Sequence, residues 1–222
     1  MGILNLGQIR TEVISSMGTR TNLTNTRVDV WINLAYTDIA SGIKFTELEG
    51  TLVIATVVGQ NNYTGPVNPL IVDLVRDDTN DRLLTYVPNN EYFRLDRSIA
   101  NAKVLRWTRR TNEILLHPNP DAIVSLTAFF TITPTVLVAD GDLTVLPPYI
   151  DNGLIYLATA QGLLSVGEDE RGGLWAQRAV GYLSSRLTGE DFSYLLEGLS
   201  NQPTSVDGAR GATSGLRDTG RV

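Results

Sequence analysis

The 222-residue sequence has no cysteine and a single histidine, His117. Without cysteine, disulfide scaffolds, thiolate metal sites and cysteine nucleophiles are excluded. With one histidine, a Ser-His-Asp triad could be built only around His117. Charged residues make up 19% of the chain, less than the roughly one quarter that is usual in globular proteins. These shortages predict a protein that is not an enzyme and that has no cofactor and no metal site.

Cations are also scarce, and lysine is nearly missing. The chain has 18 Lys and Arg against 24 Asp and Glu, which gives a net charge of -6. A protein that holds nucleic acid by neutralising phosphates should be basic, so such binding is disfavoured. Lys44 and Lys103 are the only lysines, and the other 16 cations are arginines. Arginine is enriched and lysine depleted at protein interfaces, although a codon bias explains the same pattern equally well.

Long apolar runs are absent as well. The longest, over residues 52–58, is interrupted by Thr56 and is far shorter than the roughly 18 residues that span a bilayer. The first residues contain no basic stretch followed by an apolar one, so they predict no secretory signal. We therefore expect no membrane partner, and a protein that is made and kept in a cytoplasm-like compartment.

Two helices are predicted in the first 42 residues. In the first, apolar residues with helical spacing form one stripe, and Gly18 follows where a left-handed residue often ends a helix. The members of this stripe are Leu6, Ile9, Val13, Ile14 and Met17. The second predicted helix ends at Ser41 and Gly42, and its inward residues are Val28, Trp31, Leu34, Ala35 and Ile39. Both stripes are narrow, so each helix needs a packing partner.

From residue 43 to about residue 146 the sequence is typical of strands and turns. Segments rich in Val, Ile, Thr and Phe alternate there with Asn, Asp, Gly and Pro. The predicted strands are 52–58, 70–75, 82–87, 103–108, 113–116, 123–133 and 143–146, and residues 60–69 are a predicted turn. Trp107 alternates with Arg106 and Thr108, so we expect its ring in the core and not on nucleic acid. No segment is long enough for a crossover helix, which predicts an antiparallel sheet or small sandwich.

Helical spacing returns after Pro147 and Pro148. Helices are predicted over 150–164, from 172 or 174 to 187, and over 192–199. One side of the second is expected to consist of Trp175, Ala179, Leu183 and Leu187. The last 22 residues, 201–222, are rich in Gly, Ser and Thr and cannot bury enough apolar surface to offset their ordering entropy. They predict an extended tail that is disordered when it is alone.

Together these elements predict an α+β protein. The N-terminal helices (1–42) and the C-terminal helices (147–200) form one helical bundle, which carries an inserted antiparallel β domain (43–146). Residues 201–222 form an extended C-terminal tail that binds a partner.

Three polar segments have residue types that occur in functional sites, and a structural interpretation fits each of them better. His117 lies in the turn-like sequence His-Pro-Asn-Pro-Asp and is expected at the surface. Asp140 and Asp142 flank Gly141 without a complete set of cation ligands, so they predict a turn. A charged run between two predicted helices should favour the start of the second helix or form a rim salt bridge to a neighbouring subunit. This run consists of Glu168, Asp169, Glu170 and Arg171.

The order of segments and four loose motifs resemble the head-to-tail connector (adaptor) proteins of tailed bacteriophages. Residues 27–35, Arg-Val-Asp-Val-Trp-Ile-Asn-Leu-Ala, are similar to the family's (V/L)-x-x-W-(I/L)-N-x-A helix. Residues 86–88 are similar to its strand that ends in an aromatic residue, an aliphatic residue and proline. Residues 115–121 resemble its L-x-L-x-P-x-P-D strand and turn, and 146–164 resemble the helix that follows its β region. The resemblance covers residues 5 to 190.

The resemblance implies a structural protein of the virion neck, made in the host cytoplasm. Such proteins form rings of twelve copies, dock on the portal through a C-terminal segment and extend the DNA channel toward the next neck or tail protein. Viral DNA passes through the lumen without sequence-specific binding, and an acidic wall would repel its phosphates. The tail residues expected to bind the portal are Val206, Arg210, Leu216, Arg217, Arg221 and Val222. The run from Glu168 to Arg171 is expected at ring or rim contacts.

Two other functions stay open at this point. One is a head-closure or tail-completion ring protein with a different copy number. The other is a glycan-binding module or hydrolase that uses the β region. The mass of the assembly separates them, because twelve copies favour the adaptor, six favour a tail component, and a monomer with sugar affinity favours the last.

Overall fold

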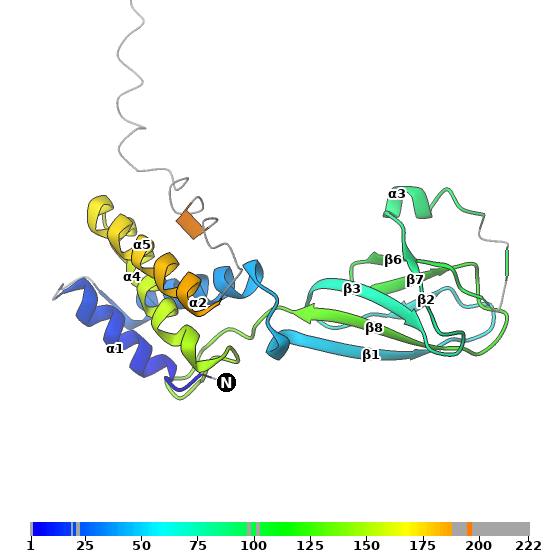
Figure 1. Ribbon diagram of the computed structural model, residues 1–222, viewed down its shortest axis with the longest axis horizontal. Coiled ribbons are helices and arrows are strands. Elements are labelled where there is room, and N and C mark those ends of the chain that lie inside the picture. The colour runs from blue at the N-terminus through cyan, green and yellow to red at the C-terminus, as the bar shows by residue number, and fades with distance from the viewer. Residues whose placement is uncertain are drawn as a thin grey trace, which may run out of the picture. The chain divides into compact units, whose positions relative to one another are not determined.

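The computed structural model describes residues 2–18, 20, 23–96, 99–100, 103–187 and 195–196. The chain divides into two compact units, one of helices and one of strands (Figure 1). The helical unit consists of residues 2–39, 137–143 and the described residues from 148 onward, and the β unit consists of residues 40–136 and 144–147. The protein is therefore α+β, as the sequence predicts.

The first helix, α1 (Leu6–Met17), ends before Gly18 as predicted, and it begins with a capping box. The Asn5 side chain accepts a hydrogen bond from the Gln8 backbone N–H at 2.9 Å, and the Gln8 side chain accepts one from the Asn5 N–H at 3.0 Å. This capping box satisfies two N–H groups that have no partner inside the helix. At the other end Gly18 has a φ of 83°, which a residue with a side chain rarely adopts.

The second helix, α2 (Asn25–Gly42), also has the predicted C-terminal end, but the prediction that Leu34 points inward was wrong. Val28, Trp31, Ala35 and Ile39 are buried, whereas Leu34 is 49% exposed. The buried arc of the helix also takes in Ile32 and Tyr36, which moves its centre away from Leu34. At 100° per residue Leu34 therefore points to the opposite side of the helix.

Helix α4 (Asp151–Ser165) is the central element of the helical unit. A short 3-10 turn, Pro148–Ile150, precedes it, and 11 of its 15 residues are buried. It packs against both α1 and α5, which lie on either side of it in Figure 1. A Cβ atom at Gly162 would lie 2.8 Å from Met17 Sδ and 2.9 Å from Trp31 Cε3. The missing side chain thus lets α1 and α2 approach α4 closely.

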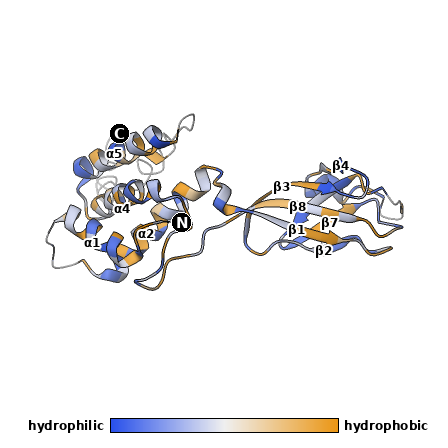
Figure 2. Ribbon diagram, turned by 60° about the horizontal axis from the view of Figure 1, so that its bottom comes forward, coloured by the Kyte–Doolittle hydropathy of each residue, from blue (hydrophilic) through white to orange (hydrophobic). Residues whose placement is uncertain are grey.

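Helix α5 (Asp169–Arg186) begins earlier than the predicted start at residue 172 or 174. The prediction left residues 169–171 out of the helix and let it begin at Gly172 or Leu174. In the structure Gly172 lies inside the helix, where a Cβ atom would be 2.7 Å from Leu164 Cγ on α4. Its small size serves close helix packing, so the helix runs through it. Figure 2 shows both hydrophobic and hydrophilic residues along α5, as expected for a helix that is buried on one side only.

The predicted helix over residues 192–199 lies outside the described residues, apart from 195–196. The predicted tail, residues 201–222, lies wholly outside them.

The strands that the structure describes form two four-stranded sheets. One has the order β1-β8-β3-β4 and the other β2-β7-β6-β5. The first sheet contains β1 (Glu49–Ala55), β8 (Ser125–Ile132), β3 (Pro69–Asp77) and β4 (Arg82–Leu83). The second contains β2 (Asn62–Thr64), β7 (Glu113–His117), β6 (Arg106–Arg110) and β5 (Thr85–Tyr86). A 3-10 turn, Thr46–Leu48, leads into the first sheet, and the short helix α3 (Asn89–Tyr92) follows β5.

Buried side chains from both sheets form one core, so the β unit is a sandwich. Ile54, Val75 and Leu126 contribute to it from the first sheet. Trp107 contributes from the second sheet and is 2% exposed, which confirms its predicted inward orientation.

Three strand predictions were wrong. The single strand expected over 82–87 is two strands in different sheets, because the buried Leu84 turns the chain from one layer to the other. Residues 143–146 form no strand, and Leu143 makes an isolated bridge to Asn5 in the helical unit. Strand β2 lies inside the segment predicted as a turn, where the Tyr63 side chain is buried in the core. Among the described strands, the pairing of β5 with β6 is parallel and the others are antiparallel; outside the strands, an isolated parallel bridge joins Ala100 and Asn119.

The expectation that His117 lies at the surface was also wrong. His117 is the last residue of β7, lies opposite Arg106 of β6 in the sheet and is only 8% exposed. Its ring meets that of Tyr92 edge to face, with centroids 6.4 Å apart. Burial, together with the nearby charge of Arg106, lowers the pKa of His117 below its ordinary value, and Asp96 opposes this in part.

The lowered pKa of His117 predicts a pH dependence of stability. Because the folded form resists protonation, the unfolded chain binds more protons once the pH falls below about 6.5, and the folded state loses stability. We expect the urea midpoint of the β unit to fall more between pH 7.5 and 5.5 in the wild type than in His117→Gln. Equal falls in the two proteins would contradict the assignment, and no other histidine complicates the comparison.

Candidate interaction surface

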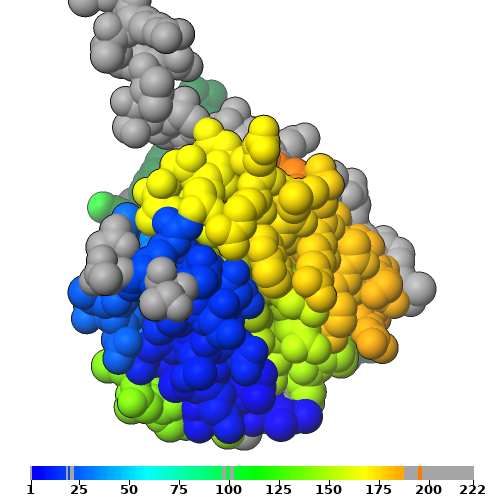
Figure 3. Space-filling view, turned by 90° about the vertical axis from the view of Figure 1, so that its left-hand side faces the viewer, coloured from blue at the N-terminus to red at the C-terminus, as the bar shows by residue number. Residues whose placement is uncertain are grey.

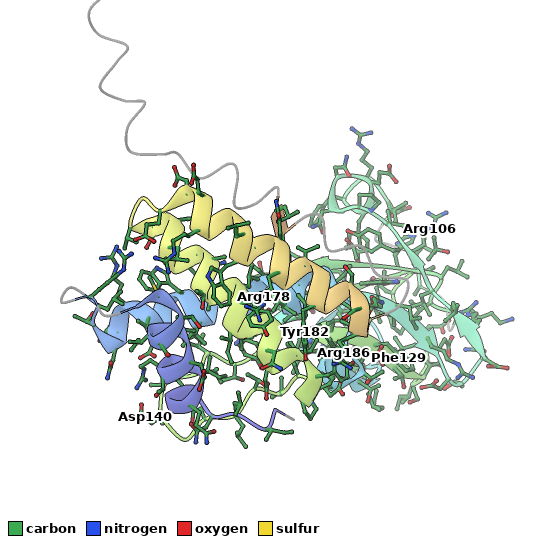
Figure 4. All side chains as sticks on the ribbon, turned by 60° about the vertical axis from the view of Figure 1, so that its left-hand side comes forward. Arg106, Phe129, Asp140, Arg178, Tyr182 and Arg186 are labelled. Atoms are coloured by element: carbon green, nitrogen blue, oxygen red, sulfur yellow. The ribbon has the colours of Figure 1, made fainter. Side chains whose placement is uncertain are left out.

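Arginines and aromatic rings alternate along one face of α5. The guanidinium carbon of Arg178 lies 4.5 Å from the ring centroid of Tyr156 on α4 and 5.0 Å from that of Trp175. About two turns further along the helix, the guanidinium carbon of Arg186 lies 5.4 Å from the ring centroid of Tyr182. We call these five residues the arginine–aromatic ladder; Figure 4 shows Arg178, Tyr182 and Arg186 in line along α5.

The rings of the ladder also contact one another. Tyr156 lies 5.6 Å from Trp175 and 5.7 Å from Tyr182, the latter pair at an interplanar angle of 84°. The three rings are half-buried, whereas both arginines are exposed. Each cation–π contact at an exposed site contributes about 0.5–1 kcal/mol. The rings therefore hold the two guanidinium groups in place while leaving their N–H donors open to solvent.

This face was not predicted from the sequence. Trp175, Arg178, Tyr182 and Arg186 are separated by three, four and four residues, the spacing of neighbours on one side of a helix. That spacing was visible in the sequence. The prediction instead placed Trp175 on one inward side of the helix with Ala179, Leu183 and Leu187, of which Ala179 and Leu183 are buried.

A groove of about 530 Å³ runs beside the ladder between α1, α4 and α5. Figure 3 looks onto the face where α1, in blue, lies beside α4 and α5. The walls of the groove contain both polar and apolar side chains, with one carboxylate, Glu12, and no histidine. The lining residues are Leu4, Gln8, Glu12, Ser16, Asn152, Ile155, Tyr156, Trp175 and Arg178. The groove thus combines polar and apolar side chains from three helices, with Arg178 of the ladder at its wall.

The corner between α4 and α5 contains the charged run predicted at the rim. Glu168 accepts a hydrogen bond from Arg171 Nη1 at 2.5 Å and forms an ion pair with Arg20. Asp169 and Glu170 occupy the first turn of α5, where negative charge is favourable, and both are exposed. Glu168 and Arg171 therefore stabilise the corner itself, whereas Asp169 and Glu170 face solvent.

Arg10 connects three parts of the helical unit. From α1 it forms a bidentate ion pair with Asp29 on α2, with Nε–Oδ1 2.6 Å and Nη2–Oδ2 3.0 Å. Its Nη1 donates to Asp140 at 2.8 Å, in the segment 137–143. The Arg10 side chain is 10% exposed, and hydrogen bonding to Asp29 is the main cause of its raised pKa.

Asn33 fixes the other end of the segment 137–143. Its side chain donates to the Leu137 carbonyl at 3.0 Å and accepts from the Leu137 N–H at 2.8 Å. Asp142 confirms the predicted turn, because its carboxylate accepts the N–H groups of Val138 and Ala139 at 2.7 and 2.8 Å. These two bonds lower the pKa of Asp142 below its ordinary value. Asn33 was not singled out in the sequence, although it is the asparagine of the motif over 27–35.

No group of three or more side chains suited to hold a metal ion occurs among the residues that the structure describes. None of the helices in the described ranges has both the length and the apolar character needed to cross a membrane.

The predicted portal-binding residues, Val206, Arg210, Leu216, Arg217, Arg221 and Val222, all lie outside the described residues.

A family model described as SU10 adaptor protein matches the chain over residues 4–199. That range includes the ladder, the α4–α5 corner and the whole β unit. No curated protein matches the chain closely enough to count as a relative.

Proposed function

The chain belongs to the SU10 adaptor protein family and is thus a structural protein of a bacteriophage, and on this premise we propose that it forms the ring that joins the portal to the next component of the neck. The ring contains twelve copies and lies between capsid and tail. Residues 201–222 dock on the portal, and the ring extends the DNA channel toward the tail. Its work is done by surfaces, and it needs no catalysis.

The arginine–aromatic ladder is the observation that carries the proposal. Tryptophan, tyrosine and arginine are the residue types that dominate binding energy at protein interfaces. The ladder presents all three on one rigid helix face, where ring contacts restrict the side chains before any partner binds. Less side-chain entropy is then lost on association. A subunit that must assemble with others is expected to have such a face.

The composition of the chain supports a passive role toward DNA. The net charge of -6 disfavours phosphate binding, and Trp107, which follows Arg106 in the arginine-rich strand β6, is buried. We propose that the lumen wall is acidic and repels the genome as it passes. A positive electrostatic potential along the lumen of an assembled ring would contradict this part of the proposal.

Deleting residues 201–222 tests the docking role. We expect the shortened protein to unfold at the same temperature as the wild type but to lose binding to purified portal particles in a co-sedimentation assay. The matched control keeps the same 22 residues in shuffled order, so that charge and length are unchanged. Unchanged portal binding after deletion, or full binding by the shuffled variant, would refute sequence-specific docking through the tail.

Native mass spectrometry of the protein bound to its portal tests the ring. Twelve copies agree with the proposal. Six copies favour a tail-completion protein, and a monomer that never assembles overturns the ring.

A further inference from the structure

The two arginines of the ladder form no ion pair with a carboxylate among the residues that the structure describes. Three other arginines of the helical unit do form ion pairs within it. Arg10 pairs with Asp29 and Asp140, and Arg20 and Arg171 both pair with Glu168. For Arg178 and Arg186 the described residues supply ring contacts and no ion pair. An exposed guanidinium that is held in position retains a fork of N–H donors that matches a carboxylate.

The carboxylates of the unit show the complementary pattern. Asp29, Asp140 and Glu168 are ion-paired, while Asp142 accepts backbone N–H groups. Two adjacent carboxylates, Asp169 and Glu170, are exposed and have no ion pair among the described residues. The helical unit therefore presents one face with two unpaired cations and one corner with two unpaired anions. Arg27, which lies over the Trp31 ring, and Glu12, which lines the groove, are single exposed charges that also have no ion pair among the described residues.

These two patches cannot neutralise each other within one copy. Both lie on α5, and a helix rises 1.5 Å per residue, so Asp169 is about 14 Å from Arg178 and about 26 Å from Arg186 along the axis. The ion-pair distance is 4 Å or less. A contact between the patches requires two molecules.

We propose that the ladder of one copy binds the Asp169–Glu170 corner of a second copy. This inference rests on the proposed ring and names the two faces through which its subunits meet. Because the two faces differ, the contact is head-to-tail, and repetition of one such contact closes a ring when the rotation allows. The aromatic rings supply the buried centre of the contact, and the arginines pair with carboxylates that are already positioned at a helix start.

A second copy fits the ladder better than nucleic acid does. Phosphates would also suit two guanidinium groups, but the net charge of -6 opposes the approach of a polyanion. The same acidic excess leaves carboxylates available on a neighbouring copy. Ring assembly and retention of a DNA duplex, measured on the same variants, distinguish the two kinds of partner.

The test uses two neutralised variants and their mixture, assembled on portal particles. Variant A carries Arg178→Gln and Arg186→Gln, and variant B carries Asp169→Asn and Glu170→Gln. We expect each alone to need about 30-fold more protein than the wild type for half-maximal ring assembly, from the loss of one interface hot spot or more. A mixture should form dimers that do not extend, because A retains the anionic corner and B retains the ladder. The matched control, Arg94→Gln with Arg110→Gln, removes two exposed arginines of the β unit and should assemble normally.

A charge-swapped chain provides the rescue. It combines Arg178→Glu and Arg186→Glu with Asp169→Arg and Glu170→Arg, and we expect it to assemble with itself but not with the wild type. Normal rings from variant A or from variant B alone would overturn the pairing while leaving the proposed ring intact. Rings that persist in variant A but lose retention of a fluorescent DNA duplex would show that the ladder binds phosphate, and would also overturn it. If the wild type itself forms no ring, the proposed function fails and not only this contact.

Discussion

Replacing Gly162 by leucine is expected to destabilise the helical unit by about 3 kcal/mol, close to the limit for one overpacking substitution. Even a Cβ atom at this position would lie 2.9 Å from Trp31 Cε3, and the Trp31 ring is buried at 6% exposure. Met17 can move its flexible end aside, but the ring of Trp31 is bulky and rigid. The leucine would therefore force α1 and α2 away from α4. Thermal unfolding followed by circular dichroism measures the loss.

Gly181 offers a matched control on α5. No atom lies within 4 Å of a Cβ built there, and the residue is exposed. Gly181→Leu should therefore raise the free energy of unfolding by about 0.5–1 kcal/mol, because leucine has a higher helix propensity than glycine. The same substitution thus has opposite signs at two helical glycines. A stabilising effect at Gly162 would contradict the close packing described for α4.

Replacing Arg10 by methionine is expected to lower the free energy of unfolding by about 2–3 kcal/mol. Methionine has a similar length and apolar volume, so the change removes the guanidinium and little packing. Asp29 would lose both of its ion-pair hydrogen bonds, and Asp140 would lose its bond to α1. With the Asp29 side chain only 23% exposed, water replaces those bonds poorly. Urea unfolding at neutral pH measures the change.

Arg76 in the β unit provides the comparison for Arg10. It also contacts two carboxylates, Asp81 at 2.6 Å and Asp78 at 3.7 Å, but its side chain is 47% exposed. Exposed ion pairs contribute little because water and salt screen them. Arg76→Met should leave the urea midpoint unchanged. If the two variants lost equal stability, burial of the Arg10 network would not be the cause.

Local periodicity predicted the helices where each helix has one buried stripe. Helix α1 follows this pattern from its capping asparagine to Gly18. The pattern was less informative for α4, which is buried on nearly all sides, and for α5, whose half-exposed Trp175 was assigned to the buried face. A periodic pattern indicates that a face is apolar, but it does not show whether another helix or a partner molecule covers that face.

Glycines and short strands were the features that sequence analysis interpreted least well. Gly172 was predicted as a possible first residue of its helix, whereas it lies inside α5, where its small size lets Leu164 of the neighbouring helix approach. The chain changes sheets at Leu84, within one continuous run of strand-forming residues. Both features depend on neighbours that are distant in sequence, and propensity does not include them.

The sequence by itself determined the α+β class, the order of most helices and strands, the inward orientation of Trp107, and the exclusion of disulfides and thiolate sites by the lack of cysteine. These depend on composition and on periods of two or about 3.6 residues, which are local properties. The tertiary structure alone decided which arginines are neutralised. Arg10 and Arg178 are both arginines on helices, and nothing next to them in sequence separates a buried ion pair from an exposed cation on aromatic rings. That difference arises from packing, which brings Asp29 to one guanidinium and only Tyr156 and Trp175 to the other.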